Sequence, residues 1–290
     1  KKPQNSYQTI RPKNKNVNRK KALRTKNIRQ NDSLFMKNDK TKKIILDIAY
    51  PALVTVATLL LWYVAALIID VKLILPTPID AFRQFFAYFA QNEFWTALGN
   101  TFLRAVYSFA IGFAVAIILA SLSATFSVAR KIINPFVAII RSVPTMSVIL
   151  LLTIWLSAAL TPTAVAMIVI FPTLYTAFLA AIDSVDKNLL QMSKVYGVSK
   201  KDIVFKLYIP NMLPQMFENV AAGFSLNLKL VIAAEALALS RTSIGKMMQY
   251  AKVAIEPAQL FALTISAVIL GVICETVIRF VGKKAIRWQK

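Results

Sequence analysis

Residues 183–212, DSVDKNLLQMSKVYGVSKKDIVFKLYIPNM, form a polar and basic stretch between two long apolar runs, and they decide the fold of this chain. Two helical patterns meet in this stretch at Gly197. Asp183 or Ser184 is placed to cap the first helix. Gly197 stands where a helix end favours a left-handed residue, a conformation that glycine adopts at little cost. The stretch predicts a compact helix-turn-helix that is exposed between two membrane spans.

The second helical pattern begins directly after the glycine. Ser199 is placed as a new N-cap, and Asp202 follows it at the spacing of a capping box. An apolar stripe then continues as far as Pro210, which has no amide N–H to offer to a helix interior. We therefore expect this second helix to stop at Pro210.

The composition around this stretch is that of an integral membrane protein. The 290 residues are 57% hydrophobic, and the mean hydropathy is +0.57. Six apolar runs are long enough to cross about 30 Å of hydrocarbon. The sequence thus predicts an all-α membrane protein whose transmembrane domain covers residues 44–290, with spans near 44–69, 101–125, 135–160, 163–182, 213–239 and 258–281.

The first 43 residues differ sharply in composition from the rest. They hold fifteen Lys or Arg and two Asp, and they show almost no apolar periodicity. We expect a mostly disordered cytoplasmic tail. Such a basic flank before a first span is a topology signal that also attracts anionic membrane lipid. Tyr7 and Phe35 are the only aromatic residues in this tail, which argues against a nucleic-acid partner.

The basic residues that flank the apolar runs indicate the orientation. Segments 126–134, 183–212 and 283–290 carry two, five and four Lys or Arg, whereas 70–100 and 240–257 carry two and three. Together with the tail, this bias predicts a multi-pass protein of a bacterial cell membrane with both termini in the cytoplasm. Outside the cell we expect an amphipathic helix within 73–91 and a short surface helix near 243–253.

Several functional classes are made improbable by missing residues. The chain has no histidine and a single cysteine, Cys274, so it offers no histidine relay and no multi-cysteine metal site. It also lacks the Gly-x-x-x-x-Gly-Lys-Ser/Thr pattern that cradles nucleotide phosphates. We expect no cofactor on this chain, and any ATP and Mg would be bound by a partner. A membrane-embedded enzyme is disfavoured because no nucleophile has a base partner.

Lys229 is the most informative single residue, because it lies near the middle of the fifth apolar run. A charge at that depth must face a polar cavity or a partner. It could line a translocation path and attract an anionic or zwitterionic solute, pair with Glu275, or snorkel to the interface. Arg104 and Arg141 are expected at span ends. Our expectation for the translocation path comprises Lys229, Asn227, Ser225 and Glu235.

From residue 75 to residue 280 the chain resembles a known family. The motifs are ILPTPIDAF, TFLRAVYSFAIGFAVAIILA, NPFVAIIRSVPTMSV and VIAAEALALSRTSIGK, together with the Gly197 stretch and its two downstream prolines. They are similar to the transmembrane permease subunits of type I ABC importers, in the nitrate, sulfonate and taurine branch. The chain departs from the family pattern at Gln191–Ser193 and has only seven glycines, so we expect close helix crossings to use Ala and Ser.

The resemblance implies a function and a set of partners. The Gly197 stretch would be a coupling helix seated in an ABC ATPase subunit, with two ATPases in each complex. A second permease copy or homologue and an external solute-binding protein or lipoprotein would complete the importer. The resemblance assigns coupling to Lys194, Tyr196, Gly197, Val198, Ser199, Lys200 and Asp202, structural roles to Pro144, Pro210 and Pro214, and the outer gate to Glu235. The alternatives are the membrane coupling subunit of an energy-coupling-factor importer and a non-transport scaffold.

Overall fold

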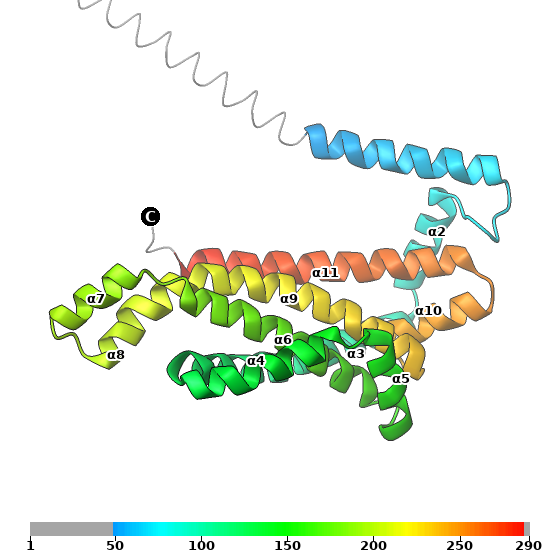
Figure 1. Cartoon of the computed structure of the whole chain (residues 1–290). Coiled ribbons are helices and arrows are strands. Elements are labelled where there is room, and N and C mark those ends of the chain that lie inside the picture. The colour runs from blue at the N-terminus through cyan, green and yellow to red at the C-terminus, as the bar shows by residue number, and fades with distance from the viewer. Residues whose placement is uncertain (1–48, 287–290) are drawn as a thin grey trace, which may run out of the picture. The chain divides into compact units, whose positions relative to one another are not determined.

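The computed structural model describes residues 49–286, and every regular element in that range is helical (Figure 1). The predicted tail at residues 1–43 lies outside the described residues. The chain forms two compact units that divide between Val64 and Ala65. Helix Ala49–Ile69 is followed by α2 Pro78–Phe89, α3 Asn92–Thr125, α4 Ser127–Ser142, α5 Thr145–Trp155, α6 Thr161–Asp183, α7 Lys187–Val195, α8 Lys200–Asp202, the π-helix η1 Ile203–Tyr208, α9 Ile209–Ala238, α10 Ile244–Val253 and α11 Pro257–Ala285.

Five of the described helices are long and apolar enough to cross a membrane. They are Ala49–Ile69, Asn92–Thr125, Thr161–Asp183, Lys200–Ala238 and Pro257–Ala285. The pair α4 and α5 supplies a sixth crossing if the two helices count as one span. The predicted all-α membrane fold is therefore confirmed.

The predicted span at residues 135–160 is not one straight helix. It is split between α4 and α5, whose axes differ by 92°. The break falls at Val143 and Pro144, which both have extended ψ angles, of 128° and 127°. A proline disfavours helical geometry in the residue before it and donates no hydrogen bond, so the chain turns here. Pro144 then serves as the N-cap residue of α5.

The helix that carries Pro210 corrects a second expectation. The helix does not stop at this proline, because α8, η1 and α9 form one helical run from Lys200 to Ala238. Before Pro210 the turns widen into η1, where the Ile209 amide donates to the Val204 carbonyl, five residues back. This wider π turn takes up the proline without breaking the helix. Pro214 also lies inside α9.

The core of the second unit lies where α3, α6 and α9 pack together. Small side chains make these close crossings possible, as Ala105, Ala116 and Ala120 are all fully buried. At Gly112 an added Cβ would lie 2.7 Å from the Ile170 side chain, so only glycine permits this approach of α3 to α6. The expected use of alanine at helix crossings is confirmed.

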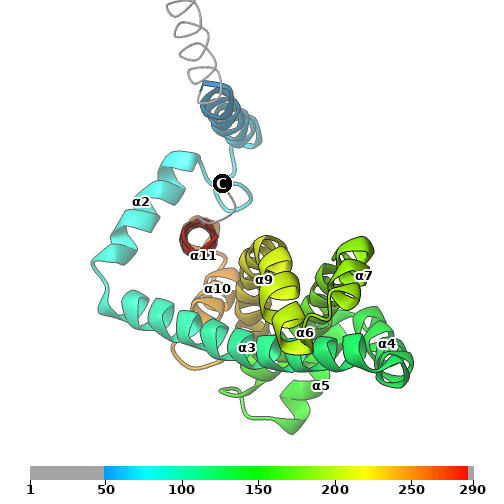
Figure 2. The ribbon, with the colours of Figure 1, turned by 90° about the vertical axis from the view of Figure 1, so that its left-hand side faces the viewer.

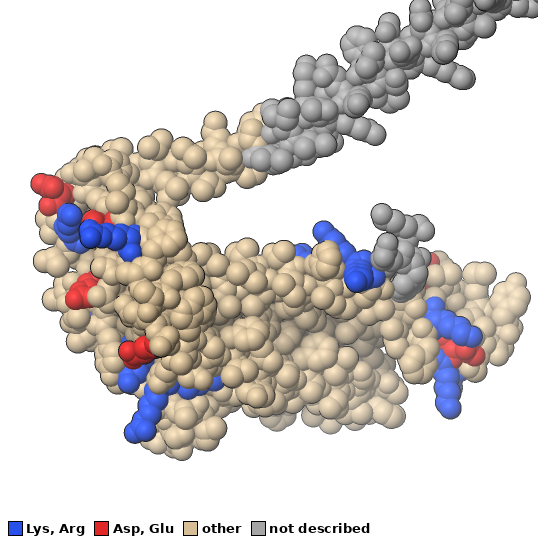
Figure 3. Space-filling view, turned by 180° about the vertical axis from the view of Figure 1, so that it is seen from behind, with Lys and Arg blue, Asp and Glu red and all other residues tan. Residues whose placement is uncertain are grey.

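The elements outside the core lie at two opposite ends of the second unit. Figure 1 shows α7 and α8 projecting beyond one end of the long helices, whereas α2 and α10 lie at the other end. In the turned view α11 is seen end-on, between α2 on one side and α9 on the other (Figure 2). Charged side chains gather at the ends, and a broad uncharged belt lies between them on the face shown in Figure 3. Such a belt suits the hydrocarbon of a bilayer.

The two predicted surface helices are present. The first is α2, capped by Thr77, whose hydroxyl accepts the Asp80 amide hydrogen at 3.2 Å. The second is α10, capped by Ser243, which accepts from the Lys246 amide at 3.2 Å. Both helices are amphipathic and bury one side against the neighbouring helices.

Candidate functional site

The turn between α7 and α8 is built around Gly197. This residue has φ +65°, in the left-handed region that glycine adopts without strain. Its amide donates to the Lys194 carbonyl at 3.1 Å, and the Val198 amide donates to the Ser193 carbonyl at 3.0 Å. These two bonds form a Schellman motif, which satisfies the last carbonyls of α7. The predicted left-handed glycine is therefore confirmed.

Ser199 caps the next helix as the spacing predicted. Its hydroxyl oxygen accepts the Asp202 amide hydrogen at 3.1 Å and donates to the Asp202 carboxylate at 2.7 Å. Asp202 also pairs with Lys206 at 2.7 Å, one turn further along the helix. The start of α8 is thus held by a hydroxyl and an ion pair close to the glycine turn.

The N-terminal cap of α7 differs from the expectation. Neither Asp183 nor Ser184 caps this helix, since both end α6 instead. The cap is Asp186, whose side chain accepts the Asn188 amide hydrogen at 2.8 Å. Asp183 is bound in an ion pair with Arg130 of α4 at 2.5 Å. Asp183, Ser184 and Asp186 could each cap a helix by residue type. Asp183 is engaged with Arg130, and Asp186 is the residue that caps α7.

The coupling segment, defined here as residues 187–208, exposes apolar side chains. None of its three helical pieces, α7, α8 and η1, contains a buried residue. Val195 is 84% exposed, Tyr196 78% and Phe205 68%. Exposed groups beside them are Lys194, Val198, Ser199 and Lys200, and Asp202 is partly exposed. A protruding apolar surface with charges around it has the composition of a protein interface.

Lys229 lies on the outer face of α9 beside α11. Its side chain is exposed and forms no ion pair with any described residue. It lines a groove of about 460 Å³ between α9 and α11, which Ser225 and Glu275 also line. The considered pair with Glu275 is not formed, because that carboxylate binds Arg279 at 3.0 Å and the Ser225 hydroxyl at 3.0 Å.

Asn227, a residue of the predicted path, is buried in this structure. This side chain is fully buried between α9 and α3, where its amide donates to the Ala105 carbonyl at 2.8 Å and to Ser108 Oγ at 3.0 Å. It lies two residues from Lys229, so the helical periodicity points the two side chains to different faces. Asn227 holds α9 against α3 and lines no surface of this chain.

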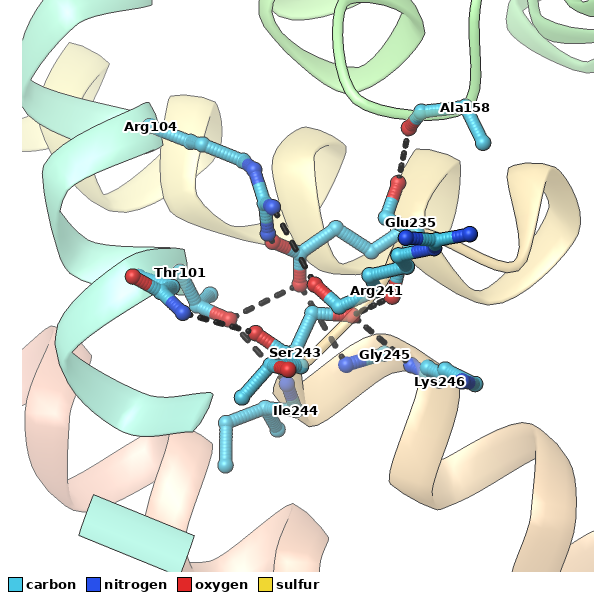
Figure 4. Close-up of polar contacts among 12 residues, drawn as sticks. Thr101, Arg104, Ala158, Glu235, Arg241, Ser243, Ile244, Gly245 and Lys246 are labelled. Atoms are coloured by element: carbon cyan, nitrogen blue, oxygen red, sulfur yellow. Dashed lines mark hydrogen bonds and ion pairs between the residues drawn. The ribbon is translucent and has the colours of Figure 1, made fainter. Parts of the chain in front are cut away.

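Glu235 is also buried rather than exposed to a path. Three donors converge on its carboxylate (Figure 4): the Thr101 hydroxyl at 2.9 Å, Arg104 Nη1 at 2.8 Å and the Gly245 amide at 3.3 Å. Its side chain is fully buried, which such a charge tolerates only with partners of this kind. In this structure Glu235 joins α3, α9 and α10, and its role at the outer gate stays a prediction.

Arg104 corrects another expectation. It lies near the start of the predicted span 101–125, but its side chain points inward to Glu235 instead of snorkelling to the interface, and 18% of that side chain is exposed. Its second terminal nitrogen donates to the Arg241 carbonyl at 3.3 Å. In the sequence these residues lie far apart, so no local spacing signals their contact.

Sequence reasoning missed a charged cluster between α9 and α11 that adjoins this groove at Glu275. Arg279 lies between two carboxylates, with Glu218 on α9 at one terminal nitrogen and Glu275 on α11 at the other. The only local signal was the spacing of Glu275 and Arg279, which places them on one helix face. The groove thus carries charges of both signs within a helix pair of membrane length.

Several helices of membrane length within one chain are the architecture of a multi-pass membrane protein. The sequence profile of the family described as "Binding-protein-dependent transport system inner membrane component" matches residues 112–287, more than half of the chain. The chain belongs to this family. It is an ABC transporter permease of the type I importer kind, which confirms the resemblance in the sequence.

Relatives with assigned names agree with this family. An ABC transporter permease protein of Brucella abortus (strain 2308) is 24% identical over 218 residues, which are 75% of this chain and 87% of the relative. The taurine transport system permease protein TauC of Escherichia coli (strain K12) is 25% identical over 66% of this chain and 71% of its own length. The aliphatic sulfonates transport permease protein SsuC of the same organism is 23% identical over 74% and 82%.

Solved structures share the fold. A chain of an amino acid ABC transporter superposes with a TM-score of 0.55 at 14% identity, over 67% of this chain and 93% of that one. A chain of the methionine transporter MetNI, in an inward-facing conformation, gives 0.50 at 18% identity, over 68% and 94%. At such identities the likeness is one of fold alone.

Proposed function

We propose that this chain is the permease subunit of an importer whose ATP hydrolysis takes place on separate ABC ATPase subunits. The coupling segment of each permease would dock one ATPase, so a complex of two permeases would contain two ATPases. A second permease, either a copy or a homologue, would complete the pathway. An external binding protein or lipoprotein would deliver the solute, and ATP with Mg would be bound by the ATPases.

The observation that carries this proposal is the coupling segment itself. Residues 187–208 protrude from the helices and contain no fully buried residue, and their apolar side chains Val195, Tyr196 and Phe205 are largely exposed. Water solvates such a surface poorly, whereas a partner groove would cover it and gain the free energy of apolar burial. The turn at Gly197 is held by hydrogen bonds, so the surface is prepared before a partner binds.

The need for an ATP-hydrolysing partner follows from the sequence. It contains no phosphate-binding loop, and Ser243–Lys246 lacks the upstream glycine of that motif. The energy for transport would therefore reach this chain through movement of the contact between the coupling segment and the ATPase. Closure of two ATPases would bring two coupling segments together and tip the permeases between their inward-open and outward-open states.

The orientation of the chain is part of the proposal. The basic flanks support an orientation with the coupling segment and both termini in the cytoplasm of a bacterial cell. α2 and α10, at the opposite end of the second unit, would then face the binding protein. The anionic lipids of the inner leaflet would contact the basic ends of the chain.

The solute we propose is a small organic molecule that is anionic or zwitterionic. Two relatives are named for taurine and for aliphatic sulfonates, which are small molecules with an anionic group. The exposed amine of Lys229 in the α9–α11 groove supports the same class for this chain. A free cation within a helix of membrane length is the group that such an anion would need.

The proposal is tested at Gly197, where φ is positive and an added Cβ would meet nothing within 4 Å. Gly197→Val should impair ATPase binding because a β-branched residue resists the left-handed conformation by about 1–2 kcal/mol, and the apolar surface would be re-aimed. Gly197→Asn is the matched control, since asparagine tolerates that conformation. The measurement is the amount of P-loop ATPase that copurifies with the tagged full chain from its own membranes.

We expect a loss of about tenfold for the valine variant and little change for the asparagine variant. Membrane insertion should be normal for both, because the turn lies outside the packed helices. Equal recovery of the ATPase with wild type and Gly197→Val would refute docking at this segment.

A further inference from the structure

The α9–α11 groove has charges of opposite sign at separate places, and this arrangement narrows the solute class. Its volume of about 460 Å³ lies within the range of small-molecule sites. The two helices pack side by side along their length (Figure 1). Their contact is close at Gly271, where an added Cβ would lie 3.7 Å from the Leu228 side chain.

Lys229 is too deep to reach the membrane surface. It lies nine residues from the end of α9 at Ala238, which is about 14 Å at roughly 1.5 Å per residue. With the end of α9 taken as the edge of a hydrocarbon layer of about 30 Å, this amine lies near the middle of the bilayer. Because no described residue pairs with Lys229 and lipid cannot solvate the charge, its groove must face water, a solute or another chain.

The opposite charge in the groove is held in place by its neighbours. Glu275 accepts hydrogen bonds from Ser225 at 3.0 Å and from Arg279 at 3.0 and 3.1 Å. Arg279 is shared with a second carboxylate, Glu218. Two carboxylates and one guanidinium give the cluster a net charge of −1, which is opposite in sign to Lys229.

Apart from these two charged places the groove is mainly apolar. Its wall includes Leu228, Ile232, Ala267, Val268 and Gly271, with the Thr264 hydroxyl as a further polar group. An apolar wall with few polar groups at defined positions is how small-molecule sites fix the orientation of a ligand. A simple anion would satisfy Lys229 but place its other end near the negative cluster, and a simple cation would have the reverse problem.

We propose that this groove binds the solute as a zwitterion. Lys229 receives the anionic group, and Glu275, positioned by Ser225 and Arg279, receives the ammonium group. The assignment rests on the proposed transport function and deepens it, because it chooses the zwitterion over the simple anion. It also adds Glu275 to the residues that contact the solute.

The test measures binding to the full-length permease in lipid nanodiscs. The probes are two zwitterions, 2-aminoethanesulfonate and 3-aminopropanoate, and their counterparts without the amino group, ethanesulfonate and propanoate. We expect the zwitterions to bind at least about tenfold more tightly to the wild type, because each counterpart loses a charged hydrogen bond. Lys229→Met should weaken all four probes by about tenfold or more.

Glu275→Gln supplies the more specific readout. It leaves one carboxylate beside one guanidinium, so the cluster becomes neutral, and the preference for zwitterions over their counterparts should disappear. Lys252→Met is the matched control, since this lysine is exposed on α10 outside the groove. It should leave all affinities unchanged.

Several results would overturn the assignment. These are the absence of binding by either zwitterion, a wild-type preference for the counterparts, or unchanged binding by Lys229→Met. If Lys229→Met instead separates the permease pair into single copies, the groove holds a second chain and the proposal fails. Copurification of the ATPase is measured on the same variants, so a failure of this site is distinguished from a failure of ATPase coupling.

Discussion

The buried ion pair of Arg104 and Glu235 should be among the largest single contributions of polar side chains to stability in this protein. Glu235 is fully buried and Arg104 is 18% exposed. Removing one partner of a buried pair costs about 3–5 kcal/mol, and the partial exposure of Arg104 places the expected cost near the lower value. Glu235→Gln keeps the shape of the side chain and one acceptor oxygen, but it leaves the guanidinium without its counter-charge.

The expected cost converts to a shift in thermal unfolding. At about 2–4 °C per kcal/mol for a chain of this size, a loss of about 3 kcal/mol lowers the midpoint by about 6–12 °C. Cys274 is the only cysteine and is partly buried, so a thiol-reactive fluorophore reports its exposure as the chain unfolds in detergent. Glu93→Gln, at an exposed site at the start of α3, is the control and should shift the midpoint by less than about 2 °C.

A double-mutant cycle separates the pair from its surroundings. Arg104→Gln alone should also destabilise the protein, because Glu235 would remain charged and buried. The double variant Arg104→Gln with Glu235→Gln should lose less than the sum of the two, by about 2 kcal/mol. Purely additive losses would refute the reasoning, since they would mean that the two side chains do not interact.

Two further predictions concern packing and a buried hydroxyl. Gly245→Ala should lower the midpoint by several degrees, because its Cβ would lie 2.5 Å from Glu235 Cβ and still closer to the Ile232 carbonyl oxygen, whereas Gly99→Ala has open space and should be neutral or stabilising. Equal midpoints for these two variants would contradict the close approach of α10 to α9. Tyr175→Phe should cost about 1–2 kcal/mol, because the hydroxyl donates to Asn134 at 2.6 Å and is hydrogen-bonded to Ser123 at 2.9 Å. The same thermal assay checks it, and an unchanged midpoint would mean that water replaces these bonds.

Local sequence was a good guide where one residue type is required by the backbone. Gly197 was predicted to be left-handed and Ser199 to cap a helix, and both are confirmed. These features depend on residues within one turn of each other, so a short piece of sequence is enough to predict them. The same local reasoning failed at Pro210, because a π turn upstream accommodates the proline inside a continuous helix.

The burial of the candidate path residues was harder to predict from the sequence than the turn at Gly197. Asn227, Lys229 and Glu235 are all polar residues in one apolar run, and spacing alone did not tell which of them faces a neighbour. The structure buries Asn227 and Glu235 against α3 and leaves Lys229 exposed. Their partners on α3 lie more than a hundred positions away in the chain.

The sequence by itself determined that this is a membrane protein of long helices, with an exposed glycine turn at Gly197 between two of the membrane spans. Hydrophobic length and backbone preference are properties of neighbouring residues, so they can be deduced without knowing how the chain packs. Only the tertiary structure decided that Glu235 belongs to the interior and that Lys229 and Glu275 share one groove. Burial and charge pairing are set by the helices that arrive from elsewhere in the chain, and no short stretch contains that information.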